Sequence, residues 1–302
     1  MMRARCRTAI LAAAFGYAGL VQSRPPASAA DFSFNPCANH AGASASQAEI
    51  TVDGRRRTYL VSVRTHVAAR RWPVVFAFHG RGETPELLAN YSGLSRLPAV
   101  VVYPRGLPGR GGKLSWSGTP AAASGVDDVR FVEAVLARLE QTSCVDPNRI
   151  YATGKSDGGG LAAQLACKAA DRFAAIAPVA GAYYPVAGGC RPARAIAVLE
   201  IHGTADRVVP YTGSPHRRLP NLHAWLVAWS ERNGCTNAPR PRTVASGVVQ
   251  ERWSGCRDGT VVEGDRIAGG GHTWPGALAS SGPGKTSTAI DATAVMASFF
   301  SL

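Results

Sequence analysis

The sequence is poor in charge and in lysine. Charged residues make up 18% of the 302 residues, and only four of the 33 basic side chains are lysines, the other 29 being arginines. With 46% hydrophobic residues, this composition excludes an intrinsically disordered chain and is ordinary for a globular protein. The sequence also lacks internal repeats and low-complexity linkers. We therefore expect one domain of catalytic size rather than two.

Long hydrophobic runs are also missing. The longest candidate, Thr8–Val21, falls well short of the roughly 20 residues that cross a bilayer. Three arginines precede this run, the small-residue tract Pro25–Ala30 follows it, and Asp31 is the first acidic residue. This pattern is typical of a secretory signal peptide. We predict a signal over residues 1–30 and a mature domain over 31–302 that is secreted, extracellular or periplasmic, without stable membrane association.

Removal of the signal changes the charge balance. The signal holds four arginines and no acidic residue, so the net charge of +13 falls to +9. The remaining arginines form short clusters without interleaved aromatic residues, at 55–57, 70–71 and 217–218. Nucleic-acid binding requires a basic patch on a recognisable module. We expect no nucleic-acid partner, and a solvated basic surface that leaves attraction to an acidic polysaccharide as a secondary possibility.

No two cysteines have the C-x-x-C spacing, which disfavours a zinc ribbon or a thioredoxin-like site. Of the seven cysteines, Cys6 lies in the predicted signal, which leaves an even six in the mature chain. Six cysteines in an exported chain suggest three disulfides, for which 15 pairings are formally possible. The pairing that we predict is Cys37–Cys144, Cys167–Cys190 and Cys235–Cys256.

Short apolar runs alternate with helical patterns along the mature chain. We predict strands over residues 57–63, 73–78, 99–103, 150–153, 174–179 and 195–201. We predict helices over residues 127–141, 158–170, 219–233 and 287–300. This alternation predicts an α/β fold with a mostly parallel central sheet covered by helices on both faces. We expect a long loop over 104–125 and a peripheral antiparallel excursion over 239–264.

The most informative motif is Gly154-Lys155-Ser156-Asp157-Gly158, a G-x-S-x-G sequence between a β-type run and a helix-forming run. In this context a serine stands on a sharp strand-to-helix turn, and the glycines avoid clashes where strand and helix approach. The hydroxyl becomes nucleophilic when a base takes its proton. We predict that Ser156 is a catalytic nucleophile, and we assign no chemical role to the side chains of Lys155 and Asp157, which we expect to pack the turn or lie at its rim.

The same segment resembles the end of a phosphate-binding P-loop, G-x-x-x-x-G-K-[ST]. That motif requires glycine at position 149, where this chain has Arg149. The residues between are Ile, Tyr, Ala and Thr, which extend a strand rather than cradle a phosphate. We exclude a P-loop.

A nucleophilic serine needs a base and an acid that orients the base, and on such a sheet they follow in the order Ser, Asp, His. Asp206 comes just after the predicted strand 195–201, at the edge where α/β sheets carry their sites. His272 ends a glycine run, 269–271, that can fold back towards the serine. We predict that His272 takes the proton of Ser156 and that Asp206 fixes its tautomer.

A developing oxyanion needs donors already aimed at it. We predict that the backbone N–H groups of Asp157, directly after the nucleophile, and of Arg81, in the loop after strand 73–78, form the oxyanion hole. His79 and His202 each precede a glycine at a strand end, and we interpret both as structural.

Longer motifs carry a family resemblance. The sequences T-G-K-S-D-G-G-G at 153–160, I-H-G-T-A-D-R-V-V-P-Y at 201–211 and G-H-T-W-P-G at 271–276 resemble those of secreted α/β-hydrolase esterases. This group contains feruloyl esterases, acetylxylan esterases and polyhydroxybutyrate depolymerases, and the turn with Lys155 is most similar to the feruloyl esterases. The resemblance spans essentially the whole mature chain. It implies the α/β-hydrolase fold, a Ser156–Asp206–His272 triad acting through an acyl-enzyme, and no metal or organic cofactor.

The resemblance predicts a secreted serine carboxylesterase, a feruloyl esterase acting on plant cell-wall xylan fragments. Depolymerases of solid polyester usually carry a linker and a separate binding module, which this chain lacks, and this favours soluble or oligomeric esters. A polyhydroxybutyrate (hydroxyalkanoate) depolymerase and an acetylxylan esterase remain alternatives, as does an inactive binding protein with a hydrolase fold. We expect Trp274 and Trp116, together with Tyr183 and Tyr184, to line an aromatic-accepting cleft, and we expect a monomer.

Overall fold

The computed structural model describes residues 44–63 and 71–302. The predicted signal peptide, Cys6 and Cys37 lie outside the described residues. No helix of the described part is long and apolar enough to cross a membrane.

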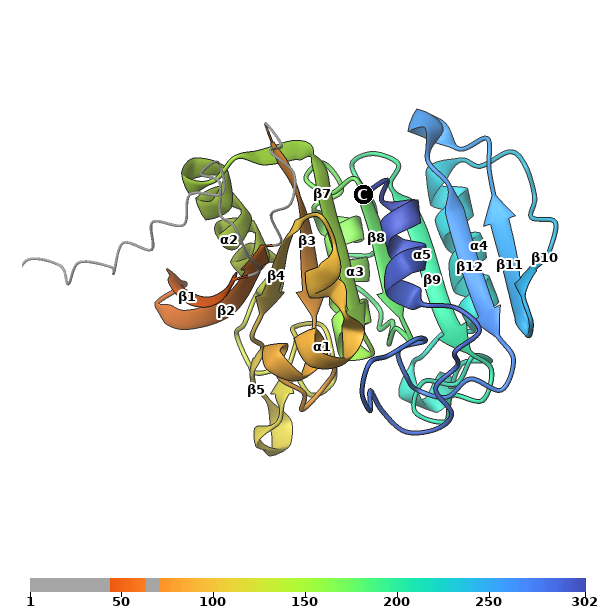
Figure 1. The fold of residues 1–302 in the computed structure, drawn as a ribbon, viewed down its shortest axis with the longest axis horizontal. Helices are drawn as coiled ribbons and strands as arrows, with labels where there is room; N and C mark the ends of the chain where they lie inside the picture. The colour runs from red at the N-terminus through yellow and green to blue at the C-terminus, as the bar shows by residue number, and fades with distance from the viewer. Residues whose placement is uncertain (1–43, 64–70) are drawn as a thin grey trace, which may run out of the picture. The chain divides into compact units, whose positions relative to one another are not determined.

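A ten-stranded sheet forms the centre of the domain (Figure 1). Its strands, in spatial order, are β1 (Ser44–Val52), β2 (Arg55–Val63), β4 (Val100–Pro104), β3 (Trp72–Phe78), β7 (Val145–Lys155), β8 (Ala175–Val179), β9 (Ala197–Gly203), β12 (Val262–Ile267), β11 (Val248–Trp253) and β10 (Arg242–Ala245). All pairings from β4 to β12 are parallel, whereas those outside them are antiparallel. The prediction of an α/β fold with a mostly parallel sheet is confirmed.

Helices cover both faces of this sheet. They are α1 (Pro85–Ser92), α2 (Asp128–Thr142), α3 (Asp157–Lys168), α4 (Leu222–Asn233) and α5 (Ala292–Phe299). In Figure 1, α1 and α5 lie in front of the sheet, and α2, α3 and α4 lie behind it. Successive side chains of a strand point to opposite faces, so Phe76 and Phe78 of β3 pack into the core under α2, α3 and α4, whereas Val75 and Ala77 pack with α1 and α5. Burial on both faces explains the continuous apolar runs that marked these strands.

The six predicted strands correspond to β2, β3, β4, β7, β8 and β9, and the four predicted helices to α2, α3, α4 and α5. The sequence analysis missed β1 and α1. The predicted long loop 104–125 contains a short hairpin, β5 (Leu107–Pro108) with β6 (Leu114–Ser115).

The segment expected to be peripheral instead extends the central sheet. Strands β10, β11 and β12 are antiparallel to one another as predicted, but β12 pairs in parallel with β9. The physical reason is packing: Val262 and Asp265 are buried, and Gly264 lies directly under Leu226 of α4, where a Cβ would clash. The expectation of a peripheral segment over 239–264 is therefore wrong, because these strands are part of the central sheet.

Two predicted disulfides are present, Cys167–Cys190 and Cys235–Cys256. Cys144 is also disulfide-bonded. Its predicted partner, Cys37, lies outside the described residues, so that pairing stays a prediction. The first bond ties the end of α3 to the loop before β9, and the second ties the end of α4 to the loop after β11.

Candidate active site

Ser156 occupies a strained turn between strand and helix. β7 ends at Lys155, α3 begins at Asp157, and Ser156 between them has φ 57° and ψ −121°. A positive φ costs energy in a residue other than glycine, and a nucleophile held this way stands clear of the sheet. A Cβ on Gly158 would clash with the Phe78 carbonyl, and one on Gly154 would lie 2.6 Å from the Gly158 backbone. The predicted turn, with its glycine requirement, is therefore present.

Asp206 and His272, far apart in the sequence, are joined by a hydrogen bond. The Nδ1–H of His272 donates to Oδ2 of Asp206 at 2.7 Å. The backbone N–H groups of Val208 and Val209 both donate to Oδ1 at 2.8 Å. Because Nδ1 carries the proton, Nε2 of His272 is left as the proton acceptor, which is the tautomer that a general base requires.

The loop that carries His272 lies against the turn that carries Ser156. The Nζ of Lys155 donates to the carbonyl of Ser281, and a Cβ on Gly282 would clash with the carbonyl of His272. Ser156, Asp206 and His272 are all buried, and each follows the carboxyl end of a strand of the parallel part of the sheet, β7, β9 and β12. The structure thus gathers the three predicted residues at one edge of the sheet.

Asp206 is held as a carboxylate. Burial by itself would raise its pKa, but the hydrogen bonds from His202 and His272 hold the pKa well below its usual range. His202, which we interpreted as structural, lies with Nε2 3.3 Å from Oδ2 of Asp206. The sequence analysis did not predict this contact. The only signal for it was the four-residue spacing in H-G-T-A-D.

The loop after β3 presents one backbone N–H without a partner. The N–H of Gly80 donates to Glu83 and that of Gly82 donates to the Leu114 carbonyl. In the part of the chain that the structure describes, the N–H of Arg81 makes no hydrogen bond. Asp157 provides the first N–H of α3, where helix donors have no intrahelical acceptor. These are the two donors predicted for an oxyanion.

Lys155 and His79 are buried. Lys155 forms an ion pair with Glu83 (Nζ–Oε1 2.5 Å), so of the two places expected for its side chain it packs at the turn and does not lie at the rim. Asp157 is also buried, and burial raises the pKa of its carboxyl to about 6, although the charge of Arg81 opposes the rise. His79 donates from Nδ1 to the Gly80 carbonyl and accepts at Nε2 from the Gly106 N–H. Those two bonds are structural, as we interpreted this residue.

The two tryptophans expected in a cleft do not line one. Trp116 and Trp274 are both fully buried. The indole N–H of Trp116 donates to the carbonyl of His79 at 2.8 Å, and that of Trp274 donates to Thr293 at 3.2 Å. Each packs a loop onto the core and satisfies its polar atom there. This part of the prediction is corrected, because a side chain without exposed surface cannot contact a substrate.

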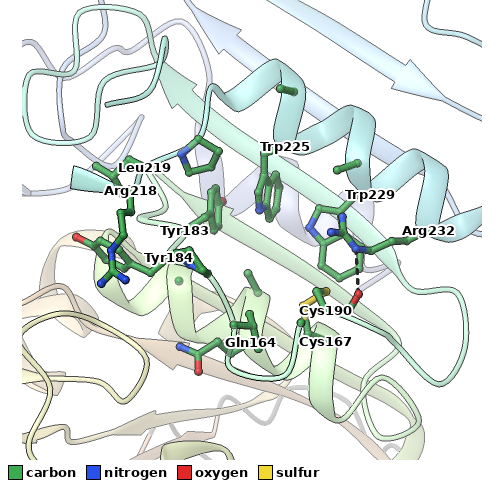
Figure 2. A pocket seen from close by; sticks show the side chains of 18 residues that line it. Gln164, Cys167, Tyr183, Tyr184, Cys190, Arg218, Leu219, Trp225, Trp229 and Arg232 are labelled. Atoms are coloured by element: carbon green, nitrogen blue, oxygen red, sulfur yellow. Dashed lines mark hydrogen bonds between the residues drawn. A yellow bond between two sulfur atoms is a disulfide. The ribbon is translucent and has the colours of Figure 1, made fainter. Parts of the chain in front are cut away.

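A pocket of about 570 Å³ opens between α3 and α4 instead (Figure 2). The partly exposed Tyr184 and Trp225 supply its aromatic surface, and the buried rings of Tyr183 and Trp229 lie behind that surface. The rings of Tyr183 and Trp225 stack in parallel, 3.8 Å apart. Arg218 lies at the end of the pocket near Tyr184 (Figure 2). The disulfide Cys167–Cys190 and Arg232, which donates to the carbonyl of Cys190, line the opposite end. Tyr183 and Tyr184 were predicted at a cleft, whereas Trp225 and Trp229 were missed.

The pocket begins beside the nucleophile without containing it. Gly160 lines the pocket, and its N–H bonds to the carbonyl of Ser156, one helical turn away. Neither Asp206 nor His272 lines it. Apolar pockets with a few polar groups are the usual form of small-molecule sites. Among the described residues, no three His, Cys, Asp or Glu side chains gather as metal ligands would.

Comparisons with known proteins agree with this geometry. The prolyl oligopeptidase family matches residues 97–193, which include Ser156. Feruloyl esterase B of Piromyces equi is 35% identical over 184 residues, which are 58% of this chain and 34% of that protein. A putative esterase, NocK, of Nocardia uniformis subsp. tsuyamanensis is 29% identical over 262 residues, covering 78% of this chain and 76% of the relative. The chain therefore spans about a third of the first relative and three quarters of the second.

Among solved structures, an acetyl xylan esterase from Aspergillus awamori superposes with a TM-score of 0.51 at 15% identity, over 75% of this chain and 94% of that one. At this identity the similarity shows the fold alone. The protein therefore has the α/β-hydrolase fold, and its sequence resembles esterases, feruloyl esterases among them, as its motifs predicted.

Proposed function

We propose that the protein is a serine carboxylesterase, with feruloyl esters of plant cell-wall xylan fragments as its substrates. The observation that carries the proposal is the hydrogen bond between His272 and Asp206, at the same sheet edge as Ser156 on its strained turn. The relatives are esterases, which supports a carboxylic ester hydrolase.

In the proposed mechanism, Nε2 of His272 takes the proton of Ser156 as its Oγ attacks the ester carbonyl. The oxyanion that forms is stabilised by the N–H groups of Asp157 and Arg81. His272 then gives the proton to the leaving alcohol, and an acyl-enzyme remains. A water molecule, activated by the same histidine, hydrolyses the acyl-enzyme. Asp206 stabilises the imidazolium in both steps.

The pocket between α3 and α4 supports an aromatic acyl group. Trp225 is partly exposed and stacks on the buried ring of Tyr183, so it can offer a flat apolar surface to a planar ring. Its start at Gly160 places it one turn of α3 from the reacting serine. Relatives named feruloyl esterase point to the same substrate class.

A substrate panel tests the proposal. Methyl ferulate, acetylated xylan, soluble hydroxybutyrate oligomers and nitrophenyl acetate are supplied to the purified protein. We expect turnover of methyl ferulate, and Ser156→Ala should lower kcat by about 10⁴-fold or more. Turnover of hydroxybutyrate oligomers with none of methyl ferulate would overturn the feruloyl assignment in favour of a depolymerase. A Ser156→Ala variant within tenfold of the parent would overturn the serine mechanism itself.

Export is part of the proposal. The arginine-rich start, the apolar run and the small-residue tract support a signal over residues 1–30, and the disulfides are consistent with an oxidising compartment. N-terminal sequencing of the protein from the culture medium or periplasm should find Asp31 or a neighbouring residue first. A chain retained in the cytoplasm with its first 30 residues intact would contradict it.

A further inference from the structure

We infer that His202, held by Glu200, is a positioning residue that donates a second imidazole N–H to Asp206 and sets how readily His272 accepts a proton. The inference rests on the proposed function, because it takes Asp206 and His272 as the acid and the base of the reaction.

Nε2 of His202 lies 2.8 Å from the carbonyl oxygen of Val209 and 3.3 Å from Oδ2 of Asp206. A carbonyl oxygen only accepts hydrogen bonds, so Nε2 carries a proton. The ring is 1% exposed, and water therefore does not compete for this N–H. One N–H of His202 thus points at the backbone and at the carboxylate together.

The other ring nitrogen of His202, Nδ1, lies 2.8 Å from Oε1 of Glu200. The hydroxyl of Tyr183 donates to the other oxygen of Glu200, and the N–H of Gly181 approaches Oε1 at 3.4 Å. Burial raises the pKa of the Glu200 carboxyl, and the hydrogen bonds from His202, Tyr183 and Gly181 oppose the rise. With donors on both of its oxygens, we take Glu200 as the carboxylate that accepts from Nδ1, which makes the ring an imidazolium. Burial alone would lower the pKa of His202, but its bonds to Asp206 and Glu200 raise it to about 9.

Asp206 accepts hydrogen bonds at both of its oxygens. Its Oδ1 accepts from two backbone N–H groups, and its Oδ2 faces the imidazoles of His202 and His272. When His272 takes the serine proton, it becomes a second cation on the same oxygen. Like charges disfavour each other's charged form. The positive charge of His202 therefore opposes the positive charge that His272 takes on in the reaction, while its N–H holds the carboxylate in place.

Other charged and titratable groups face this network. Tyr211 packs edge-on to the His202 ring at 6.0 Å, and Arg266 of β12 stands opposite His202 in the parallel register. On the side of His272, Lys155 lies beside Gly282 and is paired with Glu83. None of these groups is altered by changes at Glu200. Glu200→Gln removes the negative charge of Glu200 together with the positive charge of His202, and of these two side chains only His202 contacts Asp206.

The test is Glu200→Gln. The amide keeps the size of the carboxylate and can donate to Nδ1 of His202, which makes the ring neutral while Nε2–H stays on Asp206. We expect the acid limb of the kcat/KM profile to move up by about one pH unit or more, with kcat close to that of the parent on the alkaline side. His202→Gln, which removes the ring, should lower kcat about tenfold with little change in KM.

A matched control is His223→Gln. His223 of α4 also pairs with a glutamate, Glu251, at 3.0 Å, but its side chain is half exposed. We expect an unchanged profile. Folded Glu200→Gln and His202→Gln variants with the profile and kcat of the parent would reject the role of His202. If Ser156→Ala is inactive at the same time, the proposed function stands; an active Ser156→Ala would reject that function first.

Nitrogen-15 NMR of the imidazole rings in the parent protein needs no substitution in the network. We expect both nitrogens of His202 to be protonated at pH 7. A neutral His202 ring at pH 7 would overturn the inference, even if the variants fail to fold.

Discussion

Two buried charge networks lie on either side of the nucleophile, and they differ in what their protons can do. On one side Lys155 pairs with Glu83, which also accepts from the Tyr91 hydroxyl and the Gly80 N–H. On the other side His272 and His202 share Asp206. The first network joins the loop after β3, the turn at Ser156 and the loop that carries His272.

The second network contains two imidazoles, each of which can gain or lose a proton at a ring nitrogen. The difference suggests a division of roles, in which one network holds the loops in position and the other takes part in proton transfer. The Lys155 network fixes where the loops lie, whereas the Asp206 network decides which nitrogen carries a proton. Substitutions in the two networks should therefore fail differently, one in stability and the other in rate.

The largest effect should come from Asp206→Asn. The amide removes the charge that stabilises the imidazolium and can impose the wrong tautomer on His272. We expect kcat to fall about 10⁴-fold, which steady-state kinetics measure. A loss of less than tenfold would show that Asp206 is not the acid of the triad.

Lys155→Met should act on stability. The change leaves Glu83 buried without its cation, which costs about 3 kcal/mol of unfolding free energy. Burial tends to raise the pKa of Glu83, but Lys155 lowers it below its ordinary value, so the pair stabilises the fold above the unfolded pKa and loses this effect as the pH falls through the folded pKa.

Urea unfolding at pH 7 and at pH 4 measures this difference, which should shrink at the lower pH. The double variant Lys155→Met with Glu83→Gln is the matched control, because it leaves no buried charge, and it should recover part of the loss. Equal stability of Lys155→Met and the parent would mean that the pair holds nothing together.

The smallest effect is expected for Asp157→Asn, between the two networks. The pKa of Asp157 is raised to about 6, so the folded state binds this proton more tightly than the unfolded state. The parent should then lose stability as the pH rises from about 4 to above 6. The variant should lack this slope and gain on the order of 1 kcal/mol at pH 7. Identical curves of stability against pH for the parent and the variant would contradict a raised pKa of Asp157.

Much of the site could be predicted because its signals are local. The glycines around Ser156 report a close approach of strand and helix, and Asp206 directly follows a strand. His272 follows a glycine run because Gly271 packs against the backbone of Gly284. Each of these three sequence signals lies within a few residues of the side chain that it predicts. The parallel sheet was likewise visible in apolar runs buried on both faces.

The substrate pocket could not be predicted in the same way. Trp274 is two residues from His272 yet points into the core, whereas Trp225 belongs to a helix distant in sequence from Ser156. Which tryptophan faces a pocket depends on how α3 and α4 pack, and no short pattern encodes it. α1 is a different case, because Thr84 and Pro85 form a recognisable helix start that the sequence analysis overlooked.

The disulfide Cys167–Cys190 gives the pocket a dependence on cellular compartment. This bond forms part of the pocket lining, whereas none of the triad side chains depends on a thiol. A copy of the chain kept among cytoplasmic reductants would keep the proposed triad but lack this part of the pocket wall. The disulfide therefore links the shape of the pocket, more than the hydrogen bond between Asp206 and His272, to the compartment where the protein matures.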